Sequence, residues 1–169
     1  MAMVTTRAEE RRCVALLFGL LLAACDGGGD VGAPAVDVPV PAVRATGFDS
    51  GPVKTAAEYL VEPAFANADV ARGELLGLAC AACHKVRADE GTLVGPNLHG
   101  VFGRPAARVD GFPYSPALEQ SGLVWTPVSL AAWLGDPAGF VSGTTMAFTG
   151  YASAEDRRDL IAYLLRATQ

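Results

Sequence analysis

The sequence predicts a small all-α domain in residues 67–169, with three main helices joined by short helices and loops. Helix-capping residues precede three stretches with apolar residues near helical spacing, at Asp69, Thr126 and Ser153. The segments between them are rich in glycine and proline, and none alternates apolar with polar residues as a half-buried strand does. The chain of 169 residues has the length of one domain.

The first main helix is predicted to begin after Asp69 and to run into Cys80, because an aspartate side chain accepts hydrogen bonds from the amides of a first turn. Its apolar residues near helical spacing, which we expect to face the core, are Val70, Leu75, Leu76 and Leu78. A short helix is expected between Ser115 and Gly122, where Pro116 follows a capping serine.

The second main helix is predicted to start where Pro127 follows Thr126, a typical N-cap and first-turn pair. Its apolar residues are Leu130, Trp133 and Leu134. The last helix is predicted to open at Ser153, with Glu155 and Asp156 in its first turn. Its apolar stripe consists of Leu160, Ile161, Tyr163 and Leu164.

The composition excludes several classes of protein. The net charge is −5 and only two lysines are present, Lys54 and Lys85, so no basic surface for nucleic acid is expected. Hydrophobic residues make up 51% of the chain, which is enough for a core. The longest uncharged apolar run, Cys13 to Cys25, is shorter than the roughly 20 residues that span a bilayer, which excludes a multi-pass membrane protein.

Residues 1–24 are predicted to be a lipoprotein signal peptide. Three arginines precede a short apolar stretch that ends in small residues, the usual order in an export signal. The ending Leu22-Ala23-Ala24-Cys25 resembles a bacterial lipobox, in which the cysteine is lipidated and becomes the mature N-terminus. The alternatives are a short uncleaved anchor and an ordinary signal with a chance cysteine.

Residues 25–66 are predicted to be the lipidated N-terminus and a flexible tether. This segment opens with three consecutive glycines and contains spaced prolines, which favour flexible and extended chain respectively. Residues 56–62 are able to form a turn or two of helix. A tether of this length would let a small domain reach partners at a distance from the membrane.

The cysteines of the predicted domain form a specific motif. Cys80 and Cys83 are followed by His84, and this spacing is the attachment pattern of c-type haem. Two thiols three positions apart can each bond one vinyl group of a porphyrin while the adjacent imidazole faces the iron. The rival interpretation is a thioredoxin-like dithiol, but no βαβ pattern surrounds the motif.

An iron held by His84 needs a second ligand or an open site. After removal of the predicted signal, the remaining candidates are Met146 and His99. A single methionine is more often a core residue than a ligand. However, Met146 lies in a loop between small residues, from which its sulfur could reach a metal, whereas His99 has the alternative role of an exposed or loop-bonding histidine.

The region from Asp69 to Thr168 resembles the class I c-type cytochromes, close to mitochondrial cytochrome c and its bacterial relatives. The matching motifs are CAACH at 80–84, GPNLHGVFGR at 95–104, GFPYS at 111–115, Trp125, the segment 137–150 with Met146, and DLIAYL at 159–164. The resemblance implies an all-α class I cytochrome c fold wrapped around one covalent haem c.

The resemblance also implies a role for each site residue. Cys80 and Cys83 form the thioethers, His84 and Met146 ligate the iron, and the Pro96 carbonyl accepts the His84 Nδ1 proton. The haem propionates are held by Arg104, Tyr114, Trp125 and Thr144. On the first helix, Gly73 and Leu76 are expected to meet Leu160 and Tyr163 of the last helix. His99 matches a position that is not a ligand.

The sequence departs from the family pattern at several positions. Trp133 stands where a tyrosine usually lies near the methionine sulfur, and Leu118 replaces a polar residue beside a buried water. Leu76 or Gly77 stands in place of an aromatic residue on the first helix. The lysines that surround the haem edge in many carriers are absent, and Thr145 occupies one of their positions. Residues 67–169 contain ten acidic and eight basic side chains, so docking through a positive face is not expected.

The resulting functional prediction is a membrane-tethered one-electron carrier of a respiratory or photosynthetic-type chain, and not an enzyme. Its partners would be membrane redox complexes, with no nucleic acid, and it would be a monomer anchored by lipid in the bacterial cell envelope. It would face the periplasm, at the inner membrane if Asp26 acts as a retention signal. The alternatives are an electron-relay subunit of a larger oxidoreductase complex, and a peroxidase or small-gas sensor.

Overall fold

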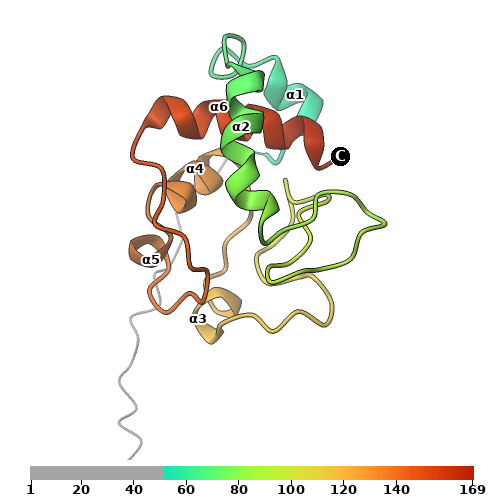
Figure 1. Cartoon of the computed structure of the whole chain (residues 1–169), viewed down its shortest axis with the longest axis vertical. Helices are drawn as coiled ribbons and strands as arrows, with labels where there is room; N and C mark the ends of the chain where they lie inside the picture. Colours follow the sequence, from blue (N-terminus) through green and yellow to red (C-terminus); the bar gives the residue numbers. More distant parts are fainter. Residues whose placement is uncertain (1–51) are drawn as a thin grey trace, which may run out of the picture. The chain divides into compact units, whose positions relative to one another are not determined.

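The computed structural model describes residues 52–169, so the predicted signal peptide, Cys25 and most of the predicted tether lie outside the described residues. The helices are α1 (Ala56–Leu60), α2 (Val70–Ala81), α3 (Pro116–Glu119), α4 (Pro127–Gly135), α5 (Pro137–Phe140) and α6 (Ala154–Ala167), as Figure 1 shows. Between residues 52 and 169 the β-structure is limited to one isolated bridge, which joins Pro105 to Val124. The all-α prediction is confirmed.

The predicted helix starts are confirmed by their caps. The side chain of Asp69 accepts a hydrogen bond from the Arg72 amide at 3.0 Å at the start of α2. Ser153 accepts from the Asp156 amide in the same way at the start of α6. Thr126 and Ser129 form a reciprocal capping box at the start of α4. These side chains satisfy amides that a first turn leaves without partners.

Helix α5 was not predicted from the sequence. It begins directly after α4, where Asp136 accepts a hydrogen bond from the Gly139 amide at 2.9 Å and Pro137 occupies the first turn. The sequence does contain a helix-start signal at this position. Asp136 is a capping residue followed by a proline, as Thr126 is at the start of α4. The helix has only four residues, too few for a periodic apolar pattern to reveal it.

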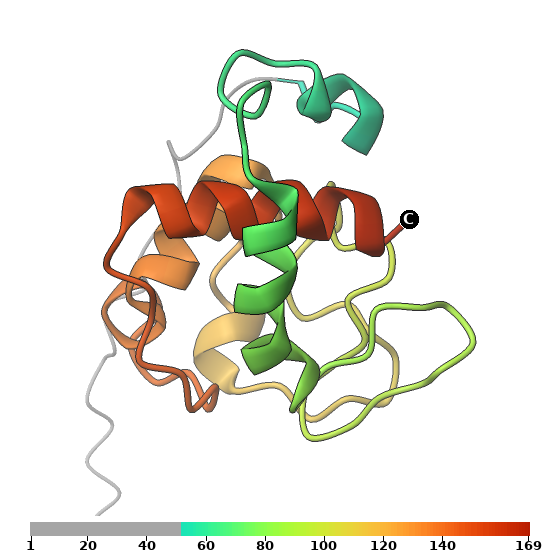
Figure 2. The same ribbon diagram turned by 45° about the horizontal axis from the view of Figure 1, so that its top comes forward.

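Helices α2 and α6 cross at close range, as Figures 1 and 2 both show. A Cβ atom placed on Gly73 would clash with the backbone carbonyl of Asp159, and one on Gly77 would lie 2.7 Å from the Tyr163 ring. Only glycine permits this approach of α2 to α6. The expectation that Gly73 lies against the last helix is confirmed, and Gly77 has the second close contact.

The expectation that Leu75 and Leu78 face the core is wrong. Their side chains are 69% and 64% exposed, whereas Gly73 and Gly77 form the buried face of α2. The periodic pattern assigned the core face to the larger apolar residues. The close crossing with α6 instead requires the smallest residues at the contact, which turns the two leucines toward solvent.

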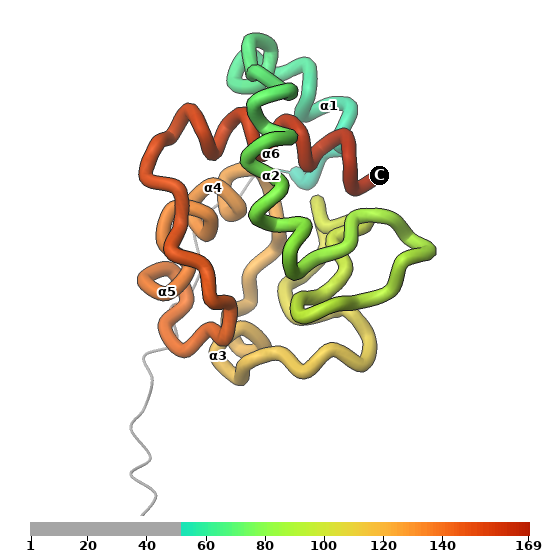
Figure 3. The backbone as a smooth tube through the Cα atoms, in the orientation of Figure 1, coloured from blue at the N-terminus to red at the C-terminus, as the bar shows by residue number. Residues whose placement is uncertain are grey.

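The core of the described residues lies on α6. Leu160, Ile161 and Leu165 are fully buried there and pack with Trp133 and Leu134 of α4. The long connection from α2 to α3 and the connection from α5 to α6 lie on opposite sides of α2 in the tube view of Figure 3. These two connections therefore flank the end of α2, where the cysteine motif lies.

The last part of the predicted tether differs from the expectation of a flexible segment. Helix α1 packs against α6, and its Tyr59 is only 5% exposed and belongs to the core cluster. The Lys54 amide donates a hydrogen bond to the Tyr59 hydroxyl at 3.3 Å. Burial of a large aromatic ring stabilises this packing and explains why the segment is ordered despite its prolines. Over residues 52–169, no helix is long and apolar enough to cross a membrane.

Candidate functional site

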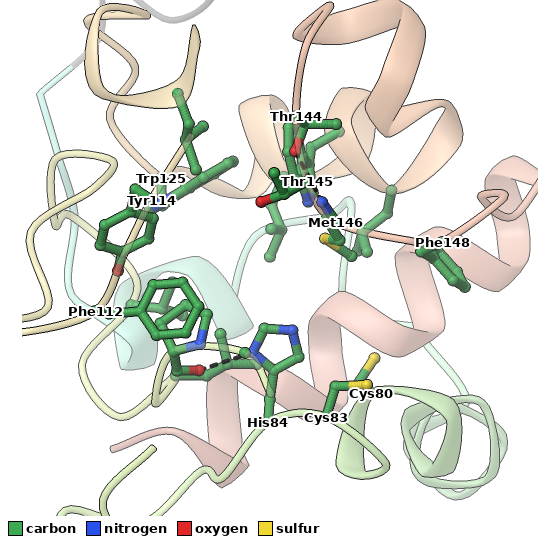
Figure 4. A pocket seen from close by; sticks show the side chains of 18 of the residues that line it. Cys80, Cys83, His84, Phe112, Tyr114, Trp125, Thr144, Thr145, Met146 and Phe148 are labelled. Atoms are coloured by element: carbon green, nitrogen blue, oxygen red, sulfur yellow. Dashed lines mark hydrogen bonds between the residues drawn. The ribbon is translucent and has the colours of Figure 1, made fainter. Parts of the chain in front are cut away.

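A cavity of about 260 Å³ lies beyond the end of α2. Its walls come from the cysteine motif, the connection from α2 to α3, helices α3, α4 and α6, and residues 144–148. Most of the lining is apolar, including Phe112, Trp125 and Phe148, which Figure 4 shows around the open space. Such a cavity suits a mostly apolar group.

The cysteine motif forms the end of α2 and the turn that follows it. The amides of Cys83 and His84 both donate to the Cys80 carbonyl, at 3.0 and 2.8 Å, so the helical turn continues through the motif. Both cysteines are free, partly buried and part of the cavity lining. Burial raises the pKa of the Cys80 thiol above its usual range. The two thiols can therefore reach one bound group from the same turn.

The orientation of His84 is set by the loop opposite. Its Nδ1 atom lies 2.7 Å from the Pro96 carbonyl oxygen, as the dashed line in Figure 4 marks. A carbonyl only accepts, so Nδ1 carries the proton and the Nε2 lone pair is available for a metal. A Cβ atom on Gly95 would clash with the His84 ring. Sequence reasoning missed Gly95, although its place directly before Pro96 in the matching motif was a signal.

Met146 lies across the cavity from His84, as Figure 4 shows. Its amide donates to the Thr144 hydroxyl at 3.2 Å, and its carbonyl accepts from the Phe148 amide at 3.0 Å. The Phe148 ring packs edge to face on Tyr151, whose hydroxyl donates to the Leu76 carbonyl of α2 at 2.9 Å. The methionine loop is thus connected to the helix that bears the cysteines.

His99 does not line the cavity. Its amide donates to the Asn97 side chain at 2.7 Å, and its carbonyl accepts from the Arg104 guanidinium at 2.8 Å. Its Nδ1 atom is buried and has no hydrogen-bond partner in the structure. Of the two candidates that the sequence left for a second ligand, the geometry therefore favours Met146.

The four residues expected at the propionates all line the cavity: Arg104, Tyr114, Trp125 and Thr144. The Arg104 guanidinium donates to the carbonyls of His99 and Asn97, and burial lowers its pKa. The Tyr114 oxygen accepts from the Val109 amide at 3.3 Å, so its hydroxyl proton is free to donate. Burial raises the Tyr114 pKa above its ordinary value of about 10, so the hydroxyl, already protonated at neutral pH, keeps its proton further into the alkaline range.

Asn97 is a further residue that sequence reasoning missed. Its side-chain amide donates to the carbonyls of Arg87 and Gly91, at 2.7 and 2.8 Å, and its oxygen accepts from His99. These bonds close the loop that carries Pro96. The signal was its place inside the GPNLHG motif, where an amide side chain between a proline and a leucine is positioned to bond loop backbone.

The donor set fits a covalently attached haem. Two thiols, one imidazole with a free Nε2, one thioether and a group of hydrogen-bond donors all reach the same apolar cavity. Trp133 and Leu118, the two departures noted in the sequence, also line it, and the Trp133 ring packs against Trp125 at 5.4 Å. Within residues 52–169, no group of three or more His, Cys, Asp or Glu side chains could hold a metal ion directly. The two thiols, the imidazole and the thioether at one apolar cavity suit an iron held by a macrocycle.

Comparisons with known proteins agree with this geometry. The family model for cytochrome c matches residues 70–168. The chain is 42% identical over 105 residues to cytochrome c of Gibberella zeae, which covers 62% of this chain and 99% of the relative. It is 44% identical over 105 residues to the cytochrome c-type cyt cy of Rhodobacter capsulatus, covering 62% of this chain and 52% of the relative.

A solved structure is also similar. Cytochrome cH from Methylobacterium extorquens matches with a TM-score of 0.53 and 43% sequence identity. The match covers 57% of this chain and 96% of that structure. The similarity therefore extends over nearly the whole of a solved protein and over somewhat more than half of this chain.

Proposed function

The chain belongs to the cytochrome c family, and on that premise we propose that it is a membrane-tethered one-electron carrier with His84 and Met146 as its haem ligands. As a member of this family it binds one covalent haem c and transfers electrons, and it is not an enzyme. The predictions of family, fold and cofactor are confirmed. The tether, the ligand residues and the electron-transport chain it serves are parts of the proposal.

One observation supports the ligand assignment most directly. The His84 imidazole, with its Nδ1 proton on the Pro96 carbonyl, and the Met146 side chain lie on opposite sides of one cavity. Held by both side chains, a haem iron would exchange single electrons and would have no place left for a substrate. Cys80 and Cys83 lie at the same cavity and are suited to hold the porphyrin through thioethers.

The surrounding residues would support this chemistry in three ways. The Pro96 carbonyl keeps the proton on Nδ1 and so keeps Nε2 toward the metal. The apolar walls exclude water, which lowers the cost of reduction relative to an exposed site. Tyr114, Trp125 and Thr144 supply hydrogen-bond donors that would satisfy carboxylates inside an apolar cavity, where an unpaired charge is costly.

The geometry supports a carrier better than a peroxidase or gas sensor. Such a protein needs an open or easily displaced ligand. Here two hydrogen bonds hold the methionine loop in place. The Thr144 hydroxyl accepts from the Met146 amide, and the Tyr151 hydroxyl donates to the Leu76 carbonyl of α2. An electron-relay subunit of a larger complex has the same site chemistry and stays as the second candidate. Identification of proteins that co-purify after mild detergent extraction distinguishes a subunit from a free carrier.

The ligand assignment is tested in the holoprotein. We expect a ferric low-spin haem with a sulfur-to-iron charge-transfer band, and loss of that band in Met146→Ala. His99→Ala is the matched control and should keep the band, because His99 does not line the cavity. Haem should also resist acid-acetone extraction, since it is attached through Cys80 and Cys83. A band that survives in Met146→Ala, or a haem released by extraction, would contradict the proposal.

The membrane attachment rests on the sequence Leu22-Ala23-Ala24-Cys25 and on the glycine- and proline-rich segment that follows it. We propose lipidation at Cys25 and a location in the bacterial cell envelope, facing the periplasm at the inner membrane. The protein would act as a monomer with membrane redox complexes as donor and acceptor. Cys25→Ser is expected to abolish lipid labelling, and an unchanged labelled band would show that the anchor is assigned wrongly.

A further inference from the structure

The mouth of the cavity is defined by residues that line it and are also exposed to solvent. Four lining residues meet both conditions: Ala79, Val94, Thr145 and Ala147. We call these four residues the rim. They come from the last turn of α2, the loop before Pro96 and the methionine loop, the segments that also carry the cysteines, Pro96 and Met146.

The rim contains no ionisable side chain. Three of its residues are aliphatic and the fourth is a threonine. Val94 is 80% exposed, Leu93 directly before it is 47% exposed, and Leu78, directly before Ala79 in the chain, is 64% exposed. The one arginine that lines the cavity, Arg104, is partly buried and donates to two backbone carbonyls. The four rim residues, together with Leu78 and Leu93, are therefore uncharged and mostly apolar although they are exposed.

An uncharged rim favours a particular kind of partner. A partner that placed charged groups on this surface would remove their hydration without supplying an opposite charge. A partner with an uncharged, apolar face would instead gain from removing Leu78, Leu93 and Val94 from water. The charge pattern of the rim thus selects against partners that recognise carriers through clustered charges.

We propose that the rim, together with Leu78 and Leu93, is the surface through which this carrier docks on a redox protein with an uncharged, apolar docking face. The proposal rests on the proposed function as an electron carrier. Electron exchange requires the partner to approach the bound group closely, and the rim residues line its cavity while remaining exposed to solvent. Association would be slower than for charge-steered carriers and nearly independent of salt.

A second copy of the holoprotein supplies a partner whose docking face is known to be uncharged. Electron self-exchange between ferric and ferrous protein, measured by magnetic resonance, oxidises one copy as it reduces the other. We expect a wild-type rate that hardly changes with ionic strength. Val94→Lys and Val94→Glu should each slow it about threefold to fivefold at low salt, because like charges then meet in the encounter. High salt should restore both rates.

Three measurements make the result specific. Val94→Thr adds no charge and should behave as wild type, as should Val128→Lys, whose site on α4 is 53% exposed but does not line the cavity. Amide line widths of the rim residues should increase with protein concentration, which reports contact without electron transfer. The charge-transfer band of each variant checks the haem ligands separately, so its loss would count against the proposed function and not against the docking surface.

The proposal fails if both charged Val94 variants exchange electrons at the wild-type rate. It also fails if one sign of charge accelerates exchange while the other slows it, because the rim would then meet a charged face. A stable dimer in sedimentation that Val94→Lys dissociates would assign the rim to a permanent contact between copies instead of to a redox partner.

Discussion

The two walls of the cavity are built in different ways. The wall that carries the cysteine motif is the end of α2, which is held against α6 by close contact at Gly73 and Gly77. The wall that carries Pro96 is a loop held by hydrogen bonds, among them those from the Asn97 side chain to backbone carbonyls and those between backbone groups. The helical wall therefore depends on close packing between two helices, whereas the loop wall depends on individual hydrogen bonds.

Charged groups strengthen the helical wall further. Asp159 on α6 is 1% exposed, and its carboxylate accepts from the Asp69 amide at 3.1 Å and from Arg158 at 2.8 Å. Arg72 on α2 also pairs with Asp156 on α6. The difference between the walls implies that changes at the crossing destabilise the whole domain, whereas changes in the loop act locally. The predictions below test this division, from the largest expected effect to the smallest.

The largest effect is expected at the crossing. Gly73→Ala should lower the free energy of unfolding by about 3 kcal/mol or more, because the added methyl clashes with the Asp159 backbone, which cannot rotate away. Denaturant unfolding of the holoprotein measures it. Gly135→Ala is the matched control: its Cβ would meet only Arg157 at an ordinary 3.6 Å, so stability should stay the same or rise slightly. Equal losses in both variants would refute the special role of the crossing.

The second effect tests whether the helical wall extends into the segment predicted as tether. Tyr59→Ala should cost about 2–3 kcal/mol of unfolding free energy, since its ring is 5% exposed and packs in the core. Val61→Ala, at a site 79% exposed on the same segment, should change stability by less than about 0.5 kcal/mol. If thermal unfolding of the two variants is indistinguishable, residues 52–66 do not contribute to the fold.

The third effect lies in the loop wall. Asn97→Ala removes the hydrogen bonds to the Arg87 and Gly91 carbonyls and should cost about 1–2 kcal/mol. Amide hydrogen exchange should show faster opening confined to residues 85–99, with little change on α6. Faster exchange across α6 instead would mean that the two walls unfold together and that the proposed division is wrong.

The smallest effect concerns pH. Burial raises the pKa of Tyr114, so the folded state keeps its proton at a pH where the unfolded chain, with a tyrosine pKa of about 10, releases it. The unfolding free energy should therefore fall as pH rises above that value, and less so in Tyr114→Phe. At neutral pH the variant should be less stable by about 1 kcal/mol, because it lacks the hydroxyl that accepts from the Val109 amide, and this offset does not depend on pH in that range. A pH profile that is unchanged by the substitution would exclude Tyr114 as a source of the decline.

Much of this protein was determined by its sequence alone. The caps at Asp69, Thr126 and Ser153 predicted the three main helices, because a cap and the periodic residues after it are local signals. The Cys80, Cys83 and His84 spacing predicted haem attachment for a similar reason, since five consecutive residues carry the whole motif. The resemblance then implied that Met146 is an iron ligand and that Arg104, Tyr114, Trp125 and Thr144 hold the propionates; these residues all line one cavity, and their roles stay predictions.

Other features were decided only by the tertiary structure. The periodicity of α2 placed Leu75 and Leu78 in the core, but the close approach of α6 selected the glycine face instead. The burial of Tyr59 likewise depends on core residues that are distant in the sequence. The fit of Gly95 depends on the His84 ring, which the fold places against it. A local pattern reports what a residue prefers, whereas the distance between packed elements decides which residue fits between them.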